Sequence, residues 1–375
     1  MNTKQLRIFL LSALLYLFSI GFTHAQGSVT LPQGPSQSSS VSQTMGLVSV
    51  SVNYNSPGVN GREGKIWGQL VPYGLNNLGF GTSTAAPWRA GANQNTTISF
   101  SHDVQVEGKE IAAGTYGLHV IVEESGDWTW IFSKNSSSWG SFFYDEKEDA
   151  LRVKASPKDS EFQEWLNFEF TDRGPDNATL TLSWEKKSLP MKIEVPNMTD
   201  LYITNMREEL RSTAGFSWQG FNSAANYCLT NNTNLEEALG WIEKGISAPF
   251  IGQANFQTLQ TKSLLLFALE RDSEAKETML AALKHDAQPM QKYQFGASLI
   301  AQNKNEEAYS YFKTIYDADP DSWISHAGMG AGLRVTGKKS KALEHYKKAL
   351  ADAPNQWKAA LEARIKAMNE EGGSR

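Results

Sequence analysis

The sequence predicts an α+β protein in two domains, an antiparallel β-sandwich followed by an all-α array of paired helices. Two observations predict this fold class. Between residues 45 and 196, short runs of alternating apolar and polar residues are separated by turns that contain Gly and Pro, as in antiparallel sheets. From residue 200 the apolar period becomes helical, and a segment recurs with an offset of 34 residues. No helical pattern alternates with the strands, which disfavours a parallel α/β sheet.

The first 25 residues have the features of a secretory signal peptide. Lys4 and Arg7 precede an apolar stretch, and residues 23–25 (Thr-His-Ala) offer a small-x-small cleavage site. The apolar stretch is shorter than the ~20 residues of a membrane-spanning helix. We therefore expect an exported protein, periplasmic or secreted, that does not span the membrane once the signal is removed. Residues 26–44, rich in Ser, Gln and Gly, predict a flexible lead-in.

Composition narrows the classes of partner. The net charge is −5, and neither half has a basic surface, so nucleic acid and anionic membranes are not expected partners. Cys228 is the only cysteine, so the chain contains no internal disulfide and depends on its hydrophobic cores. Its neighbours in AANYCL predict that Cys228 is a small buried apolar residue.

The first domain is expected to span residues 45–196. In residues 48–54 (VSVSVNY), apolar side chains alternate with small polar ones, which predicts a half-buried strand. Residues 124–127 and 172–177 have the composition of hairpin turns. Further strands are expected at 96–101, 116–122, 128–133, 166–171, 179–184 and 191–195. Many short strands broken by such turns favour a sandwich over other β architectures.

The second domain, residues 200–371, is built from repeats. EEAYSYFKTIYDADP (306–320) aligns with SKALEHYKKALADAP (340–354), with Ala308 on Ala342 and Phe312 on Tyr346. A helix–turn–helix period of 34 residues is that of tetratricopeptide arrays. The small residue lets two helices approach, and the aromatic fills the groove between them. Helix pairs are expected at 223–229 with 235–246, 256–269 with 274–284, 291–302 with 306–316 and 322–335 with 341–351, a connecting helix at 200–216, and a capping helix at 356–371.

Catalytic and metal-binding patterns are incomplete. Residues 58–65 (GVNGREGK) resemble a phosphate-binding loop, but the glycine spacing is wrong and Ile66 replaces the Ser/Thr that would hold Mg²⁺. Residues 145–149 (DEKED) are acidic, but Ala150 stands where a calcium loop needs Gly. No two histidines share the spacing of a helical metal site. We therefore expect no metal and no cofactor, and we assign no catalytic residue.

One group of loops is a candidate ligand site. Loops rich in aromatics, Gly and Arg are typical of clefts for carbohydrates or anionic ligands, since they combine flat apolar faces with hydrogen-bond donors. The alternative interpretation is that the aromatics fill the sandwich core and the arginines cap loop carbonyls. The candidate ligand-binding residues are Arg62, Trp88, Arg89, Asn93, Lys134 and Trp139.

These same stretches carry a family resemblance. The motifs GREGKIWGQLVPYG, WRAGAN, VEGKEIAAGTYGLHVI, WTWIFSK and YDEKEDALRV occur in this order within residues 45–196. This part of the chain resembles the bacterial family called domain of unknown function 2911. The resemblance implies export, since the family is typical of exported proteins of Bacteroidetes-type bacteria, and some members carry a similar helical-repeat half. It brings no activity, but it favours the loop of residues 88–93 as a site.

The function expected from these observations is binding, without catalysis. The leading hypothesis is an exported scaffold protein of the cell envelope, of unknown ligand, whose helical repeats hold another envelope protein or a peptide. The alternative is a hydrolase acting on glycans or other envelope material through a loop cleft in the β domain. A carboxylate such as Asp145 converging with Arg62, Arg89 and Asn93 would favour the enzyme. Arginines held by backbone carbonyls would not.

Overall fold

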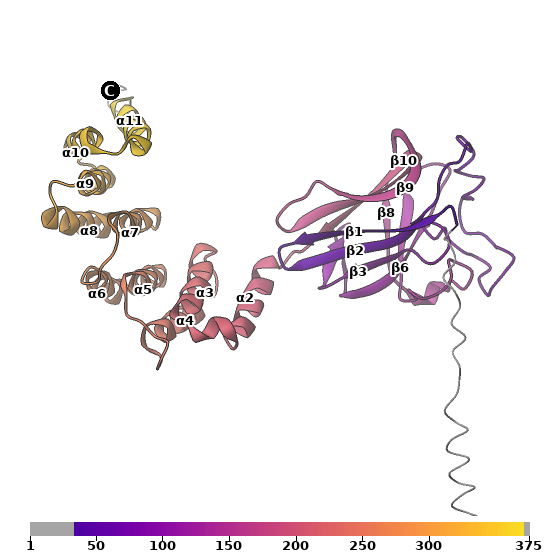
Figure 1. The fold of residues 1–375 in the computed structure, drawn as a ribbon, viewed down its shortest axis with the longest axis horizontal. Helices are drawn as coiled ribbons and strands as arrows, with labels where there is room; N and C mark the ends of the chain where they lie inside the picture. Colours follow the sequence, from indigo (N-terminus) through magenta and orange to yellow (C-terminus); the bar gives the residue numbers. More distant parts are fainter. Residues whose placement is uncertain (1–33, 371–375) are drawn as a thin grey trace, which may run out of the picture. The chain divides into compact units, whose positions relative to one another are not determined.

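The computed structural model describes residues 34–370, which divide into two compact units (Figure 1). The first unit ends at Pro196 and the second begins at Asn197. Each unit has its own set of buried apolar side chains. The predicted signal peptide, residues 1–25, lies outside the described residues, as does the first part of the lead-in.

The first unit consists of two antiparallel sheets, which confirms the predicted class. The larger sheet has the order β1-β2-β3-β6-β7-β8 and the smaller one β5-β4-β10-β9, and every strand pair is antiparallel. The strands are β1 (Gln37–Met45), β2 (Val48–Ser56), β3 (Thr97–Phe100), β4 (Val104–Val106), β5 (Lys109–Ile111), β6 (Gly114–Ile121), β7 (Trp128–Ser133), β8 (Asp149–Ala155), β9 (Lys158–Thr171) and β10 (Asn177–Glu194).

The core of this unit lies between the two sheets. Alternate residues of β2 are fully buried, as the alternating pattern predicts. Phe168 of the smaller sheet contacts two aromatic rings of the larger one. Its ring centre lies 4.9 Å from that of Tyr54 and 6.4 Å from that of Trp130. These contacts join the sheets into a sandwich.

Three features differ from the sequence-based expectation. Residues 37–44 were predicted to be flexible, and this is wrong because they belong to β1, which pairs along its whole length with β2. β1 is an edge strand that main-chain hydrogen bonds hold in place, and most of its side chains are polar. It therefore has no apolar pattern that could predict a strand. The short strands β4 and β5 and the strand β8 were not anticipated. The two strands expected at 179–184 and 191–195 are one strand, β10, interrupted by a bulge near Glu185.

The second unit contains ten α-helices within its described residues, and these confirm the all-α half. They are α2 (Met198–Glu209), α3 (Trp218–Thr230), α4 (Leu235–Ser247), α5 (Phe256–Ala268), α6 (Asp272–Ala282), α7 (Pro289–Ala301), α8 (Asn305–Ala318), α9 (Trp323–Val335), α10 (Lys339–Asp352) and α11 (Asn355–Glu370). Each expected pair is present, from α3/α4 to α9/α10, and α11 follows as the terminal helix (Figure 1). The connecting helix ends at Glu209, earlier than expected, and a 3₁₀ turn follows at Thr213–Phe216.

Small residues and aromatics pack these helices as the repeat predicts. Ala308 and Ala342 are fully buried, and so are the aromatics four residues later, Phe312 and Tyr346. A Cβ placed on Gly296 of α7 would lie 2.2 Å from the Phe312 ring. The aromatic ring therefore occupies space that only a glycine on the neighbouring helix leaves free.

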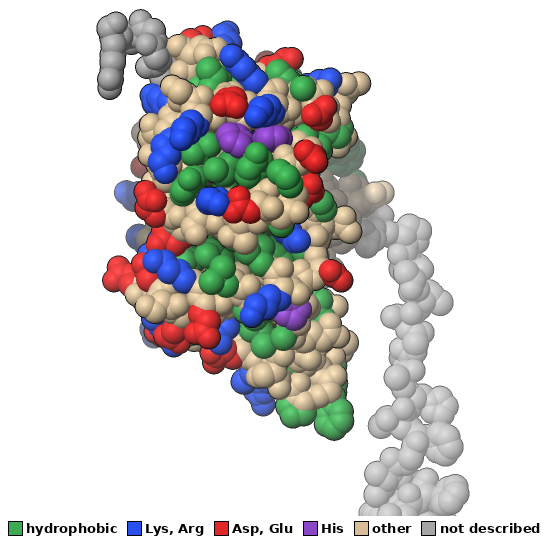
Figure 2. All heavy atoms as spheres, turned by 90° about the vertical axis from the view of Figure 1, so that its left-hand side faces the viewer, with side chains coloured by type: hydrophobic (Ala, Val, Ile, Leu, Met, Phe, Trp, Pro, Cys, Tyr) green, Lys and Arg blue, Asp and Glu red, His purple; other side chains and the backbone are tan. Residues whose placement is uncertain are grey.

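Ion pairs join the second helices of neighbouring pairs on the surface of this unit. Lys276 of α6 lies 3.0 Å from Glu307 of α8, and Lys304 lies 2.7 Å from Asp272. Figure 2 shows a face of the unit on which basic and acidic side chains are interspersed with apolar ones. Such mixed exposed pairs contribute little stability each. None of the helices described has the length and apolar character of a membrane span.

A matched pair of glycine substitutions tests the packing of the repeats. Gly296→Ala should destabilise the helical unit by about 1–3 kcal/mol, because the new methyl group overlaps the buried Phe312 ring. Gly240→Ala, in α4 where a Cβ would meet nothing within 4 Å, should instead stabilise it by about 0.5–1 kcal/mol through helix propensity. Urea unfolding followed by circular dichroism at 222 nm measures both changes. Equal effects of the two substitutions would contradict this account.

Candidate functional site

The segment that contains Trp88 and Arg89 is fixed to the larger sheet. Trp88 exchanges two main-chain hydrogen bonds with Val120 of β6, of 2.9 and 2.8 Å. Beyond it, the amide of Ala92 donates to the carbonyl of Asn55, and the Asn93 side-chain amide donates to the carbonyl of Ser36. The loop is therefore held at both ends by main-chain acceptors.

The same loop contains two residues in an unfavourable backbone conformation. Ala90 and Asn93 both have positive φ, of 50° and 56°. Such a conformation costs of order 1–3 kcal/mol for a non-glycine residue and persists only where the surroundings enforce it. The result is a tight turn that directs Arg89 back over its own loop.

Arg89 is half-buried and has no acidic partner. Its guanidinium lies 5.0 Å above the centre of the Phe142 ring, and Nη1 donates to the carbonyl of Asn93 over 2.6 Å. A Cβ on Gly140 would lie 2.3 Å from the guanidinium carbon, so the cation is enclosed between a ring and bare backbone. Burial lowers the pKa of Arg89. Among the residues described, no carboxylate forms an ion pair with it.

His119 lies beneath this cation. It is buried, and burial, followed by the positive charge of Arg89, lowers the pKa of His119 to about 3. Its Nδ1 is 3.3 Å from the hydroxyl oxygen of Ser141. A histidine with such a pKa is neutral at physiological pH, so it supplies no charge to balance Arg89.

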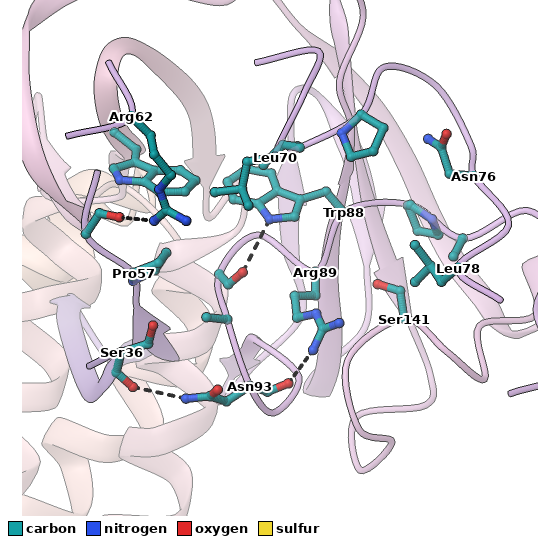
Figure 3. Close-up of a pocket in the computed structure, with 18 of the residues that line it drawn as sticks. Ser36, Pro57, Arg62, Leu70, Asn76, Leu78, Trp88, Arg89, Asn93 and Ser141 are labelled. Carbon is teal, nitrogen blue, oxygen red and sulfur yellow. Dashed lines mark hydrogen bonds between the residues drawn. The ribbon is translucent and has the colours of Figure 1, made fainter. Parts of the chain in front are cut away.

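Arg62 is held by its own turn. Its Nε donates to the carbonyl of Val59 over 2.9 Å, and Nη2 donates to the carbonyl of Gly58 over 2.8 Å. Capping of loop carbonyls was the alternative interpretation of the two arginines, and both make such bonds. Both also line one pocket in the β unit (Figure 3).

The pocket has a volume of ≈ 650 Å³. Its charged lining residues are Arg62 and Arg89, and no carboxylate lines it among residues 34–370. Its other lining residues are uncharged: Pro35, Ser36, Pro57, Gly58, Asn60, Leu70, Val71, Pro72, Asn76, Leu78, Ala86, Pro87, Trp88, Gly91, Ala92, Asn93, Ser141 and Trp184. The pocket is therefore a cationic, partly apolar cavity.

Four tryptophans support the floor of the pocket. The Trp67 ring lies 5.6 Å from Trp88, 4.9 Å from Trp128 and 5.8 Å from Trp184, and Trp88 stacks on Trp184 at 6.0 Å. Trp184 is 1% exposed, and its indole nitrogen has no hydrogen-bond partner in the described part of the chain. The indole nitrogen is itself buried, as is that of Trp67, so the tryptophans present their apolar surfaces to the pocket.

The structure brings four of the six candidate residues together. Arg62, Trp88, Arg89 and Asn93 line the pocket. Lys134 and Trp139 do not: Lys134 contributes a main-chain bond to Glu148, and Trp139 is 53% exposed on the surface. The acidic segment is also elsewhere, since Asp145 caps the short 3₁₀ helix at Glu146–Glu148.

Sequence reasoning missed a second pocket, in the helical unit. It has a volume of ≈ 290 Å³ and is lined by residues of α7, α9, α10 and α11. Arg364 donates to the hydroxyl of Tyr293 over 2.6 Å, and Arg334 is hydrogen-bonded to Tyr346. No acidic residue among those described lines this pocket. The sequence held one signal for this pocket. Tyr293 and Arg334 lie on the first helix of their pairs, and Arg364 lies on the terminal helix.

A glycine pair tests the enclosure of Arg89. Gly140→Ala should lower the stability of the β unit by about 1–3 kcal/mol more than Gly126→Ala, because only the first methyl group meets the guanidinium. Both glycines have positive φ, of 59° and 81°, and a Cβ on Gly126 would meet nothing within 4 Å, so the control isolates the steric effect. Thermal unfolding followed by tryptophan fluorescence measures the difference. Equal melting temperatures for the two variants would show that Arg89 is not enclosed.

Comparisons with solved structures find helical-repeat proteins. A tetratricopeptide repeat protein from Parabacteroides merdae is 15% identical over 46% of this chain and 72% of its own, with a TM-score of 0.31. A thermophilic TPR protein of Thermus thermophilus is 17% identical over 46% of this chain and 90% of its own, with a TM-score of 0.32. YrrB, titled a TPR protein with an unusual peptide-binding site, is 21% identical over 45% and 84%, with a TM-score of 0.29. No curated protein sequence matches the chain.

The β unit matches a family model. Residues 36–193 match the family described as "Protein of unknown function (DUF2911)", which begins at the edge strand β1 and ends within β10. The pairs α7/α8 and α9/α10 begin 34 residues apart, the period read from the sequence, whereas α3 and α5 begin 38 residues apart. The chain thus carries a DUF2911 domain followed by tetratricopeptide-like helical repeats.

Proposed function

We propose that the chain is an exported scaffold protein of the cell envelope whose helical repeats hold an acidic segment of another protein. Helical-repeat arrays of this kind serve protein–protein interaction. The observation that carries the proposal is the pocket lined by α7, α9, α10 and α11, where two arginines and two tyrosines lie together without an acid among the described lining residues.

The arginines of this pocket differ from the other arginines described in the unit. Arg207 pairs with Glu237, and Arg271 pairs with Glu274, both at 2.7 Å. Arg334 and Arg364 are exposed and form no ion pair with a described carboxylate. Their neighbours Tyr293 and Tyr346 are neutral hydroxyl groups. Two unpaired guanidinium groups over an apolar floor suit a carboxylate that approaches from a partner.

The proposal therefore rests on binding by the helical repeats and not on catalysis. The hydrolase alternative would require an acid or base at the pocket of the β unit, and no described lining residue is Asp, Glu or His. Ser141 lies beside a histidine that is neutral and buried, and no carboxylate orients that histidine among its described partners. No observation favours the hydrolase.

A peptide-binding experiment tests the acidic partner. The mature chain should bind a fluorescein-labelled hexaglutamate peptide at least ten times more tightly than the matched hexaglutamine peptide, and binding should weaken as salt increases. Replacing both Arg334 and Arg364 by Met should reduce binding of the acidic peptide at least ten-fold. The control Arg211→Met removes a cation that pairs with Glu208 outside the pocket, and it should leave binding unchanged. Fluorescence anisotropy that gives equal affinities for both peptides would refute the proposal.

Intact-mass analysis tests export. Lys4, Arg7, the apolar stretch and Thr23-His-Ala25 support cleavage after Ala25. Protein recovered from the envelope or medium of an expressing bacterium should have the mass of a chain that begins at Gln26. Recovery of the full-length chain from the cytosol would contradict the proposal.

A further inference from the structure

We infer that the pocket of the DUF2911 domain binds a small molecule that carries a carboxylate or phosphate group next to an apolar or aromatic portion. Arg89 would hold the oxyanion, and Trp88, Leu70 and Leu78 would contact the apolar portion. This site lies in the other unit from the helical pocket, so it does not depend on the proposed function of the repeats.

No ion pair balances the positive charge of the pocket within residues 34–370. Arg62 and Arg89 are both half-buried, and the charge of neither is balanced by a carboxylate within residues 34–370. The chain that precedes the pocket cannot balance it, because residues 1–33 contain no Asp and no Glu. Partial burial of a cation without an opposite charge is unfavourable, and a bound anion removes that penalty.

The geometry of Arg89 leaves donors available. An arginine has five N–H groups, and the described structure shows one hydrogen bond from Arg89, from Nη1 to the carbonyl of Asn93. The Phe142 ring and the backbone of Gly140 hold the guanidinium plane, so the cation is fixed before a ligand arrives. A fixed planar guanidinium suits bidentate contact with a carboxylate or phosphate.

Part of the remaining wall is apolar. In Figure 3, Trp88 and Leu70 lie between Arg62 and Arg89, and Leu78 lies on the far side of Arg89 from Arg62. Leu70 and Leu78 are 47% and 38% exposed, which is high for leucines that line a cavity. A volume of ≈ 650 Å³ lies within the range of small-molecule sites. Apolar contact therefore accompanies the anionic contact.

A set of three probes that differ in charge tests the inference. Phenyl phosphate, phenylacetate and neutral 2-phenylethanol are titrated calorimetrically into the mature chain. At least one anionic probe should bind ten-fold or more tightly than the alcohol, and the stronger of the two identifies phosphate or carboxylate as the preferred group. Arg89→Met should weaken that binding at least ten-fold, and Arg89→Lys should weaken it as well, since it keeps the charge but not the planar fork.

A cation outside the pocket provides the control. Arg173 contacts Gln43 in the same unit and does not line the pocket, so Arg173→Met should leave binding unchanged. If the Arg89 variants fail to fold, the comparison of the three probes on the wild type decides. Equal affinity for the alcohol and the anions, absence of binding for all three at millimolar concentration, or undiminished binding by a folded Arg89→Met variant would each overturn the inference.

Discussion

The packing of four tryptophans against one another determines the shape of the β domain around its pocket. Trp67 contacts Trp88, Trp128 and Trp184, so one ring joins residues far apart in the sequence. Buried aromatic pairs contribute stability beyond the area that they bury. This packing also positions Arg89. Trp88 lies between β6 and the ring of Trp184, and this fixes the main chain that carries Arg89. Rigid core packing thus positions a loop residue.

Positive charge has different partners on the surface and in the two pockets. On the helical surface, Lys276 and Lys304 face carboxylates of the neighbouring helix pair, and these ion pairs join neighbouring repeats. In the two pockets, the arginines face tyrosine hydroxyls, main-chain carbonyls or an aromatic ring. Those partners orient a guanidinium without neutralising it. Both pockets therefore retain positive potential in a chain whose net charge is −5.

The fold could be predicted because its signals are local. The alternation of apolar and polar residues in Val48–Tyr54 and the repeat spacing of Ala308 and Phe312 can be recognised from residues that are close in the sequence. β1 is held instead by main-chain pairing with β2, which leaves no side-chain pattern in the sequence. The site could be predicted only in part. Residue types in loops indicated the pocket, but not that the loop with Lys134 faces elsewhere. Tyr293 and Arg364 are 71 positions apart, so their contact depends on the stacking of repeats.

The edge strand β1 has a consequence for how the domain meets other chains. It pairs along the edge of β2, a strand rich in β-branched residues whose main chain would otherwise be open to pairing with a foreign strand. A serine- and glutamine-rich strand thus forms one boundary of the larger sheet. Loss of residues 37–45 by proteolysis would uncover the main chain of β2, and a strand from a second molecule could then take the vacated position. The main chain of β2 is therefore covered by a strand whose own side chains are mostly polar.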